Sequence, residues 1–313
     1  MTETLIDLAV RSLAGLVDLD VERTKYRGHA RELAAAARVD LIVVLGGDGS
    51  INEVVNGVMS WDGTGPGGDG STPGGDGSTP GGDGSTGEPP LIAVIPGGGA
   101  NVLARALGLP VDAAAAIRRV REVIATGRYR TIGLGLAGDR YFTFSAGLGM
   151  DAEVVREVER LRAKGRREST PLFLRTMVRQ YYRTDRRRPA LTLERDGQPP
   201  ISDLFLTIIT NRSPWTYFRS RPLLPVPNPD FNSGLDLLGL RRIRLITIVS
   251  AVGQMLYIRS RPLRRQDLLS VLGSESLTVR SARPIAFQVD GEYLGETEAV
   301  EFRFVPHALR VVA

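Results

Sequence analysis

Cysteine is absent from this chain of 313 residues, and histidine occurs only at His29 and His307. The absence of cysteine excludes a disulfide framework and thiol-based catalysis. A zinc site of the usual kind needs several histidine or cysteine ligands, so two histidines argue against one. A chain without disulfides is typical of the cytoplasm, which is the location that we expect.

Long hydrophobic runs are also missing. The N-terminus lacks the basic start and apolar run of a secretory signal. The longest apolar stretch, residues 245–258, contains Gln254 and is shorter than the ~20 residues that span a bilayer. Any membrane contact is therefore expected to be peripheral, at the inner face of the membrane.

Lysine is scarce, so the net charge of +5 comes almost entirely from arginine. Basic charge is compatible with binding to nucleic acid, anionic membranes or phosphorylated ligands. The base composition of the genome would explain the many arginines equally well. Hydrophobic residues make up 42% of the chain, which at this length suits two folded domains.

Strand and helix patterns alternate over the first 128 residues, which predicts an α/β domain with a parallel sheet. The expected elements are helix 27–38, strand 41–45, helix 51–59, strand 91–95, and helices 102–107 and 112–126. Residues 63–90 interrupt this pattern, because Pro-Gly-Gly-Asp-Gly-Ser-Thr occurs three times from Pro66. The repeats have no apolar residues to bury, so we expect a surface loop and assign them no chemistry.

Short strands with alternating polarity dominate after residue 128. They predict an antiparallel β-sandwich over 129–305, with 306–313 returning to the first domain and a cleft between the two. Strands are expected at 141–145, 190–195, 203–210, 235–241, 276–280, 285–289 and 300–304, and helices at 152–163, 170–183 and 245–259.

Gly46-Gly47-Asp48-Gly49-Ser50 lies between a buried strand and a helix. Glycines let a backbone approach a phosphate closely, and N–H groups at a helix N-terminus attract anions. Asp48 would repel phosphate without a cation between them, so the loop predicts a Mg²⁺-nucleotide. A tight turn without a ligand is the alternative.

A second glycine loop, residues 96–101, also follows a strand, and loops at the carboxyl ends of parallel strands face one crevice. Here Asn101 could equally cap its helix, and Arg105 could be a solvated helix residue. Asp290-Gly291-Glu292 is a common hairpin signal, but a carboxylate aimed at the cleft could accept a hydroxyl proton.

Two familiar nucleotide motifs are excluded. Gly133, Gly135 and Gly138 fit G-x-G-x-x-G, but a strand pattern follows them where a dinucleotide site needs a helix. No Gly-Lys dipeptide occurs, so a P-loop of the Walker type is absent.

Six segments in order resemble the diacylglycerol kinase catalytic-domain family, bacterial lipid kinases that are similar to sphingosine kinases. They are residues 24–30 (TKYRGHA), 46–57 (GGDGSINEVVNG), 96–110, 146–152 (AGLGMDA), 234–236 (GLD) and 289–292 (VDGE). The resemblance implies an ATP-dependent kinase that phosphorylates a lipid hydroxyl at the membrane surface, with diacylglycerol as the leading substrate. It implies no nucleic-acid partner, and a homodimer is compatible with it.

The resemblance also implies roles for individual residues, with ATP and Mg²⁺ as cofactors. The ATP phosphates would be held by Gly46, Gly47, Gly49 and Ser50, with Asp48 acting through Mg²⁺. The rest of the nucleotide site would comprise Thr24, Asn52, Glu53, Gly97, Gly98, Asn101 and Arg105. Glu292, with Asp290 beside it, would be the base, and Asp236 would belong to a second cation site.

Three departures from the family pattern are expected to matter. The family begins with a strand ending in Asn-Pro-x-Ser-Gly, and this chain opens in what looks like the following helix. Gly99 stands where Ser or Thr is usual, and Asn232 and Ser233 stand where an acidic residue is frequent. A catalytically impaired lipid- or nucleotide-binding regulator is therefore the alternative from another class. NAD kinases and phosphofructokinases share the Gly-Gly-Asp-Gly loop, but 52–57 and 100–105 favour the lipid branch.

Overall fold

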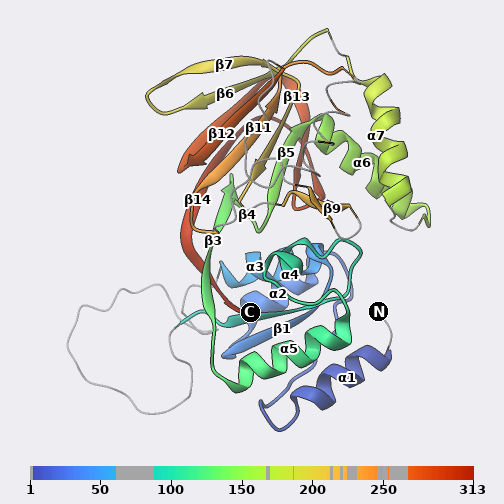
Figure 1. The fold of residues 1–313 in the computed structure, drawn as a ribbon, viewed down its shortest axis with the longest axis vertical. Helices are drawn as coiled ribbons and strands as arrows, with labels where there is room; N and C mark the ends of the chain where they lie inside the picture. The colour runs from blue at the N-terminus through green and yellow to red at the C-terminus, as the bar shows by residue number, and fades with distance from the viewer. Residues whose placement is uncertain are drawn as a thin grey trace, which may run out of the picture.

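The computed structural model describes residues 3–60, 88–166, 170–185, 187–211, 214–218, 221–223, 231–244, 248, 253 and 267–313. The predicted repeats, Asp230 and most of the predicted helix 245–259 lie outside these residues. Figure 1 shows an α/β part formed by the N-terminal elements and a β-rich part above it, as the sequence predicts.

The N-terminal sheet is built on two parallel strands, β1 (Leu41–Gly46) and β2 (Leu91–Pro96). The apolar run in β2 is fully buried from Ile92 to Ile95, because helices cover the sheet. These helices are α1 (Glu3–Leu13), α2 (His29–Ala36), α3 (Asp48–Val58), α4 (Val102–Ala106) and α5 (Ala113–Ala125). Helix α2 packs closely on α3, since a Cβ on Gly57 would lie 2.4 Å from the Arg31 carbonyl oxygen.

One long strand, β14 (Glu292–Val312), connects the two parts. It pairs antiparallel with β13 (Ser276–Val289) and with β3 (Arg130–Ala137), and its end at Val311 and Val312 runs parallel to β2. The N-terminal sheet is therefore mixed rather than purely parallel. The division at residues 128 and 305 stays a prediction, because β3 and β14 contribute to both parts.

The described strands of the C-terminal part are antiparallel, as predicted, but they pair into one continuous twelve-stranded sheet with the N-terminal strands. The remaining strands are β4 (Arg140–Phe142), β5 (Ser145–Gly149), β6 (Leu191–Arg195), β7 (Gln198–Leu204), β8 (Leu206–Thr210), β11 (Leu235–Leu240) and β12 (Leu268–Ser274), with a separate hairpin of β9 (Thr216–Phe218) and β10 (Arg221–Leu223). The central order is β14-β13-β5-β8-β11-β12.

Two helices lie beside this sheet, α6 (Met150–Ala163) and α7 (Thr170–Arg183), and both were expected from the sequence. Among the described helices, none has both the length and the apolar character needed to cross a bilayer.

The glycines of the excluded G-x-G-x-x-G pattern have a packing role. Gly133 and Gly135 lie within β3. A Cβ on Gly135 would lie 2.1 Å from the Phe142 ring, and one on Gly133 would lie 2.5 Å from the Phe304 ring. Both positions therefore need glycine because aromatic rings pack directly on the backbone.

Candidate active site

The two glycine loops pack against each other at the ends of β1 and β2. The Gly97 N–H donates to the Gly46 carbonyl at 2.8 Å. A Cβ on Gly98 would lie 2.7 Å from the Gly47 Cα, so the backbones touch where neither has a side chain. The two loops therefore lie against each other at the carboxyl ends of β1 and β2, and the crevice expected there stays a prediction.

The first loop presents the N-terminus of α3, which has no side-chain cap. The first N–H groups of a helix have no partner within it and attract anions. A Cβ on Gly49 would meet nothing within 4 Å, so space is open beside this turn. Asp48 Oδ1 accepts a hydrogen bond from the Leu103 N–H at 3.3 Å, which ties α3 to α4. The arrangement can receive a phosphate group.

Asn101 shapes the second loop. Its φ of 48° is left-handed, a conformation that asparagine tolerates better than most residues. Its side chain accepts from the Gly98 N–H at 2.9 Å and donates to the Gly98 carbonyl at 2.8 Å. The alternative that Asn101 caps α4 through its side chain is therefore wrong.

Arg105 reaches the C-terminal part from α4. Its guanidinium carbon lies 3.5 Å from the centroid of the Tyr217 ring in β9, the geometry of a cation–π contact. It is therefore more than a solvated helix residue, because it connects the second loop's helix to the β9–β10 hairpin.

We expect Gly98→Ala to raise the KM for nucleotide about tenfold, because the added methyl group would force the two loops apart. Gly99→Ala is the matched control, since a Cβ there would meet nothing within 4 Å. Steady-state kinetics with varied nucleotide measure both variants. Equal KM values for the two would show that loop contact does not shape the site.

The structure places the Glu53 carboxylate at the start of α2 and Thr24 before it. The Glu53 carboxylate accepts from the Gly28 N–H at 2.8 Å and the Ala30 N–H at 3.2 Å. Its oxygens therefore stabilise the first turn of α2, and its contact with a nucleotide stays a prediction. Thr24 is exposed in the segment before α2, and its role stays a prediction.

Asp290 is a buried junction between the two parts of the chain. Its carboxylate, 5% exposed, accepts five hydrogen bonds. The donors are the Asn52 amide of α3, the backbone N–H groups of Thr143, Phe144 and Ser145, and the Thr143 hydroxyl. Burial raises the pKa of Asp290. Both oxygens of Asp290 thus accept hydrogen bonds that join the two parts of the chain, and its catalytic role beside Glu292 stays a prediction.

Glu292 lies two residues further on and is held by two arginines. Its Oε1 accepts from the Arg27 guanidinium and its Oε2 accepts from Arg140 Nη2 at 2.8 Å. Arg140 also donates to Asn52 Oδ1 at 2.9 Å, so Glu292 is oriented from the same junction as Asp290. Its side chain is 17% exposed. The sequence carried no motif that singles out Arg27 or Arg140 for this position.

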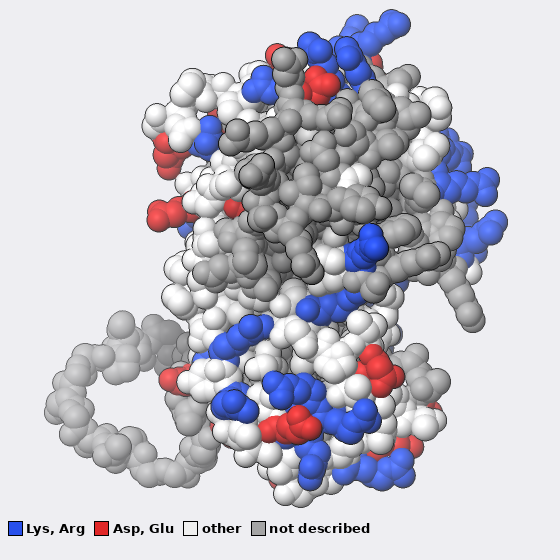
Figure 2. All heavy atoms as spheres, in the orientation of Figure 1, with Lys and Arg blue, Asp and Glu red and all other residues white. Residues whose placement is uncertain are grey.

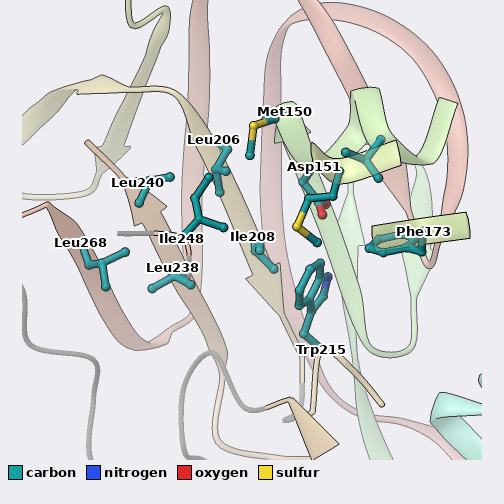
Figure 3. Close-up of a pocket in the computed structure, with 12 residues that line it drawn as sticks. Met150, Asp151, Phe173, Leu206, Ile208, Trp215, Leu238, Leu240, Ile248 and Leu268 are labelled. Carbon is teal, nitrogen blue, oxygen red and sulfur yellow. The ribbon is translucent and has the colours of Figure 1, made fainter. Parts of the chain in front are cut away.

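An apolar pocket opens in the C-terminal part, beside α6 and α7 (Figure 3). It is lined by Met150, Asp151, Val154, Phe173, Met177, Leu206, Ile208, Trp215, Leu238, Leu240, Ile248 and Leu268. Among the described residues of this lining, Asp151 is the one carboxylate. Sequence reasoning missed the pocket because these residues come from elements far apart in the chain.

Asp151 links the pocket to the Glu292 turn. Its Oδ2 accepts from Gln288 Nε2 at 2.8 Å, and Gln288 Oε1 accepts from the Gly291 N–H at 2.9 Å. Burial raises the pKa of Asp151 to about 6. The same turn therefore touches α3 through Asn52 on one side and the apolar pocket on the other.

The stability of an Asp151→Asn variant tests whether the pKa of the buried Asp151 carboxyl is raised. Because the folded-state pKa is raised from 3.8 to about 6, the native state holds the proton more tightly, and stability falls as pH rises between about 4 and 6. The shift corresponds to about 3 kcal/mol. Between pH 4 and pH 7, we expect the free energy of unfolding of the variant to rise by about this much relative to that of the wild type. Urea unfolding at several pH values measures this difference. A pH-independent difference would contradict the buried, raised pKa.

Asp236 is the residue expected to belong to a second cation site, and this role stays a prediction. It is buried in β11, its Oδ1 accepts from the Gly273 N–H at 2.9 Å, and burial raises its pKa to about 6. Among the described residues, no group of three or more histidine, cysteine or acidic side chains could hold a metal ion.

Comparisons with known proteins identify similar chains. The family described as diacylglycerol kinase catalytic domain matches residues 3–135, which include both glycine loops. A diacylglycerol kinase of Bacillus subtilis (strain 168) is 26% identical over 276 residues, covering 85% of this chain and 76% of that protein. One from Staphylococcus carnosus (strain TM300) is 25% identical over 270 residues, covering 83% and 72%.

A crystal structure of a diacylglycerol kinase from Bacillus anthracis (strain Sterne) has the same fold. The TM-score is 0.67 at 19% identity, and the match covers 99% of this chain and 90% of that one. The fold class expected from the sequence is therefore confirmed.

Proposed function

We propose that this diacylglycerol kinase-like lipid kinase transfers the γ-phosphoryl group of ATP to a lipid hydroxyl, most simply converting diacylglycerol to phosphatidic acid. One observation carries the proposal. The turn that bears Glu292 is hydrogen-bonded to α3 of the glycine loops through Asp290 and Asn52, and to the apolar pocket through Gln288 and Asp151.

The nucleotide side rests on the paired glycine loops. The N–H groups at the start of α3 would bind phosphate oxygens. The absence of side chains at Gly47 and Gly98 lets the backbones of the two loops approach each other closely. Asp48, at the first position of α3, fits a magnesium site, because this ion is held by one or two carboxylates together with substrate phosphates. Bound Mg²⁺ would neutralise charge on the phosphate oxygens.

Glu292 is the residue that would accept the proton of the lipid hydroxyl. The hydroxyl oxygen forms a bond to the γ-phosphorus, and the bond from that phosphorus to the β–γ bridging oxygen breaks. The proton passes to Glu292, and ADP leaves with the bridging oxygen. Arg27 and Arg140 would hold the carboxylate in place and offset charge nearby. Phosphoryl transfer requires mainly positioning, which this network supplies.

The lipid side rests on the apolar pocket. Its lining is aliphatic and aromatic apart from Asp151, which suits an acyl chain rather than a polar substrate. A peripheral position at the inner face of the membrane goes with this proposal.

The test is incubation of the chain with Mg²⁺, labelled ATP and micellar diacylglycerol, sphingosine, ceramide or undecaprenol, beside Asp48→Ala and Glu292→Ala. Label in phosphatidic acid that both variants lose supports the proposal. Label in another lipid would change the substrate but keep the reaction. No labelled lipid, with ATP still bound in an equilibrium assay, would favour a nucleotide-binding regulator.

A further inference from the structure

The hairpin of β9 and β10 lies where the two parts of the chain meet. In Figure 1, β9 stands directly above α4, the helix that follows the second glycine loop. The hairpin is a two-stranded sheet of its own, and among the described strands it pairs with none of the twelve-stranded sheet. Because an isolated two-stranded hairpin is only marginally stable in water, the position of β9 depends on what its side chains contact.

Trp215 and Leu223 connect the hairpin to the apolar pocket. Trp215 lines the pocket, and Figure 3 shows its ring between Ile208 and Phe173. The Trp215 N–H donates to the Leu223 carbonyl at 3.0 Å, which joins the residue before β9 to the end of β10. Leu223 is 8% exposed and packs in the hydrophobic cluster that also contains Ile208. The hairpin therefore forms part of the pocket wall.

Tyr217, two residues after Trp215, connects the same hairpin to the glycine loops. The Arg105 guanidinium carbon lies 3.5 Å from the centroid of its ring, and both side chains are half-buried. Arg105 belongs to α4, whose first three residues are buried. The Leu103 N–H of that helix donates to the Asp48 carboxylate at the start of α3. A displacement of Asp48 would therefore reach Arg105 through a packed helix.

Arginine suits this position for a chemical reason. A guanidinium group can stack its face on an aromatic ring while the N–H groups at its edge bind phosphate oxygens. Stacking on Tyr217 thus orients Arg105 and leaves the edge of its guanidinium to other partners. Basic side chains also gather on the face of the α/β part that Figure 2 shows, which favours an anionic ligand such as a nucleotide.

We propose that Tyr217 is a positioning residue that couples the glycine loops to the apolar pocket. A nucleotide phosphate at the loops fixes Arg105, the stacked ring of Tyr217 is fixed with it, and the hairpin then holds Trp215 against the pocket. A ligand in the pocket fixes the hairpin from its other end. Each ligand meets a hairpin that the other has already ordered, so the two bind with positive cooperativity. The inference rests on the proposed function, because it requires a nucleotide at the glycine loops.

The contact between Arg105 and Tyr217 limits the size of the coupling, since a ligand can shift the hairpin only by the free energy of the contacts that carry the effect. A partly buried cation–π contact corresponds to about threefold to tenfold in affinity. By linkage, the nucleotide and the pocket ligand change each other's Kd by the same factor.

Trp215 reports on this coupling through its fluorescence. The chain has two tryptophans, so Trp61→Phe leaves Trp215 as the single emitter. The probe is a non-hydrolysable ATP analogue, adenylyl imidodiphosphate, with Mg²⁺, and its binding is measured in parallel by titration calorimetry. Saturation with the analogue, without any lipid present, is expected to lower acrylamide quenching of Trp215 about twofold.

A single alkyl chain, 1-decanol, tests the reverse direction, and its entry into the pocket is followed as protection of Trp215 from acrylamide. We expect decanol to lower the Kd of the analogue about threefold to tenfold in the Trp61→Phe chain. Added to this chain, Tyr217→Phe keeps the ring and should keep both effects. Tyr217→Leu keeps an apolar side chain without the ring, and it should still bind the analogue but lose both effects.

Tyr129→Leu is the matched control, because it removes a ring whose centroid lies 5.6 Å from the guanidinium carbon of Arg310, outside the loops and the pocket lining. It should keep both effects, and their loss in this control would overturn the role of Tyr217. If Tyr217→Leu does not fold, Arg105→Leu removes the other half of the contact, and full coupling in that variant would also overturn the proposal.

The outcomes separate the coupling from the proposed function. Binding of the analogue that leaves the quenching of Trp215 unchanged would overturn the coupling and leave the kinase function standing. Decanol that protects Trp215 without changing the Kd of the analogue would do the same. An analogue that does not bind would overturn the coupling and the proposed function together.

Discussion

Replacing Glu292 by glutamine is expected to lower kcat for lipid phosphorylation by about 10²–10⁴-fold, the usual contribution of a positioned general base. Glutamine keeps the shape and an acceptor oxygen for Arg27 or Arg140, so the Glu292 turn should hold its position. The KM for ATP should change little, because the glycine loops are untouched. Steady-state kinetics with labelled ATP and saturating micellar lipid provide the measurement.

Glu296→Gln is the control on the same strand. Glu296 also pairs with an arginine, Arg156, but it is 49% exposed and lies outside the Asp290 junction. It should retain full kcat. A Glu292→Gln enzyme with wild-type kcat would remove Glu292 as the base, and a large rise in the KM for ATP would instead assign it to nucleotide binding.

Local sequence patterns predicted the glycine loops and their helices because each depends on neighbouring residues. A strand, a glycine turn and the start of a helix lie within a few positions in both loops, although β1 is only partly buried. Their mutual packing followed from the rule that carboxyl ends of parallel strands meet at one edge.

The partners of the candidate site could not be predicted in the same way. Arg27 and Arg140 meet Glu292 across 265 and 152 residues, and Gln288 meets Asp151 across 137. No periodicity or spacing encodes such contacts, since they depend on how β13, β14 and α6 pack. The apolar pocket was hidden for the same reason, because its lining reads as ordinary core.

The sequence also does not predict which way a carboxylate side chain points in the folded chain. Asp290 and Glu292 were treated alike as candidates, yet one is enclosed by five donors and the other faces two arginines. Glu53 likewise accepts hydrogen bonds from backbone N–H groups at the start of α2, which the sequence did not predict. Only the fold shows that Asp290 is enclosed by hydrogen-bond donors and that Glu292 is held between two arginines.

Asp290→Ala is expected to lower the free energy of unfolding by more than about 4 kcal/mol. The substitution removes the acceptor of five hydrogen bonds, three of them from consecutive backbone N–H groups at 143–145. Each buried donor left without a partner costs about 1–3 kcal/mol, and entry of water would recover only part of this. The φ of 47° adds a smaller cost, because alanine adopts a left-handed conformation less readily than aspartate.

Asp203→Ala separates these two contributions, because Asp203 also has a positive φ, 65°, but is exposed in β7. Urea unfolding of both variants measures the difference, which should exceed about 3 kcal/mol if the carboxylate joins the two parts of the chain as described. If Asp290→Ala does not fold, Asp290→Asn keeps one acceptor oxygen and should show a smaller loss. A loss no greater than that of Asp203→Ala would mean that the backbone at 143–145 finds other acceptors. Glu292 would then owe its position to Arg27 and Arg140 alone.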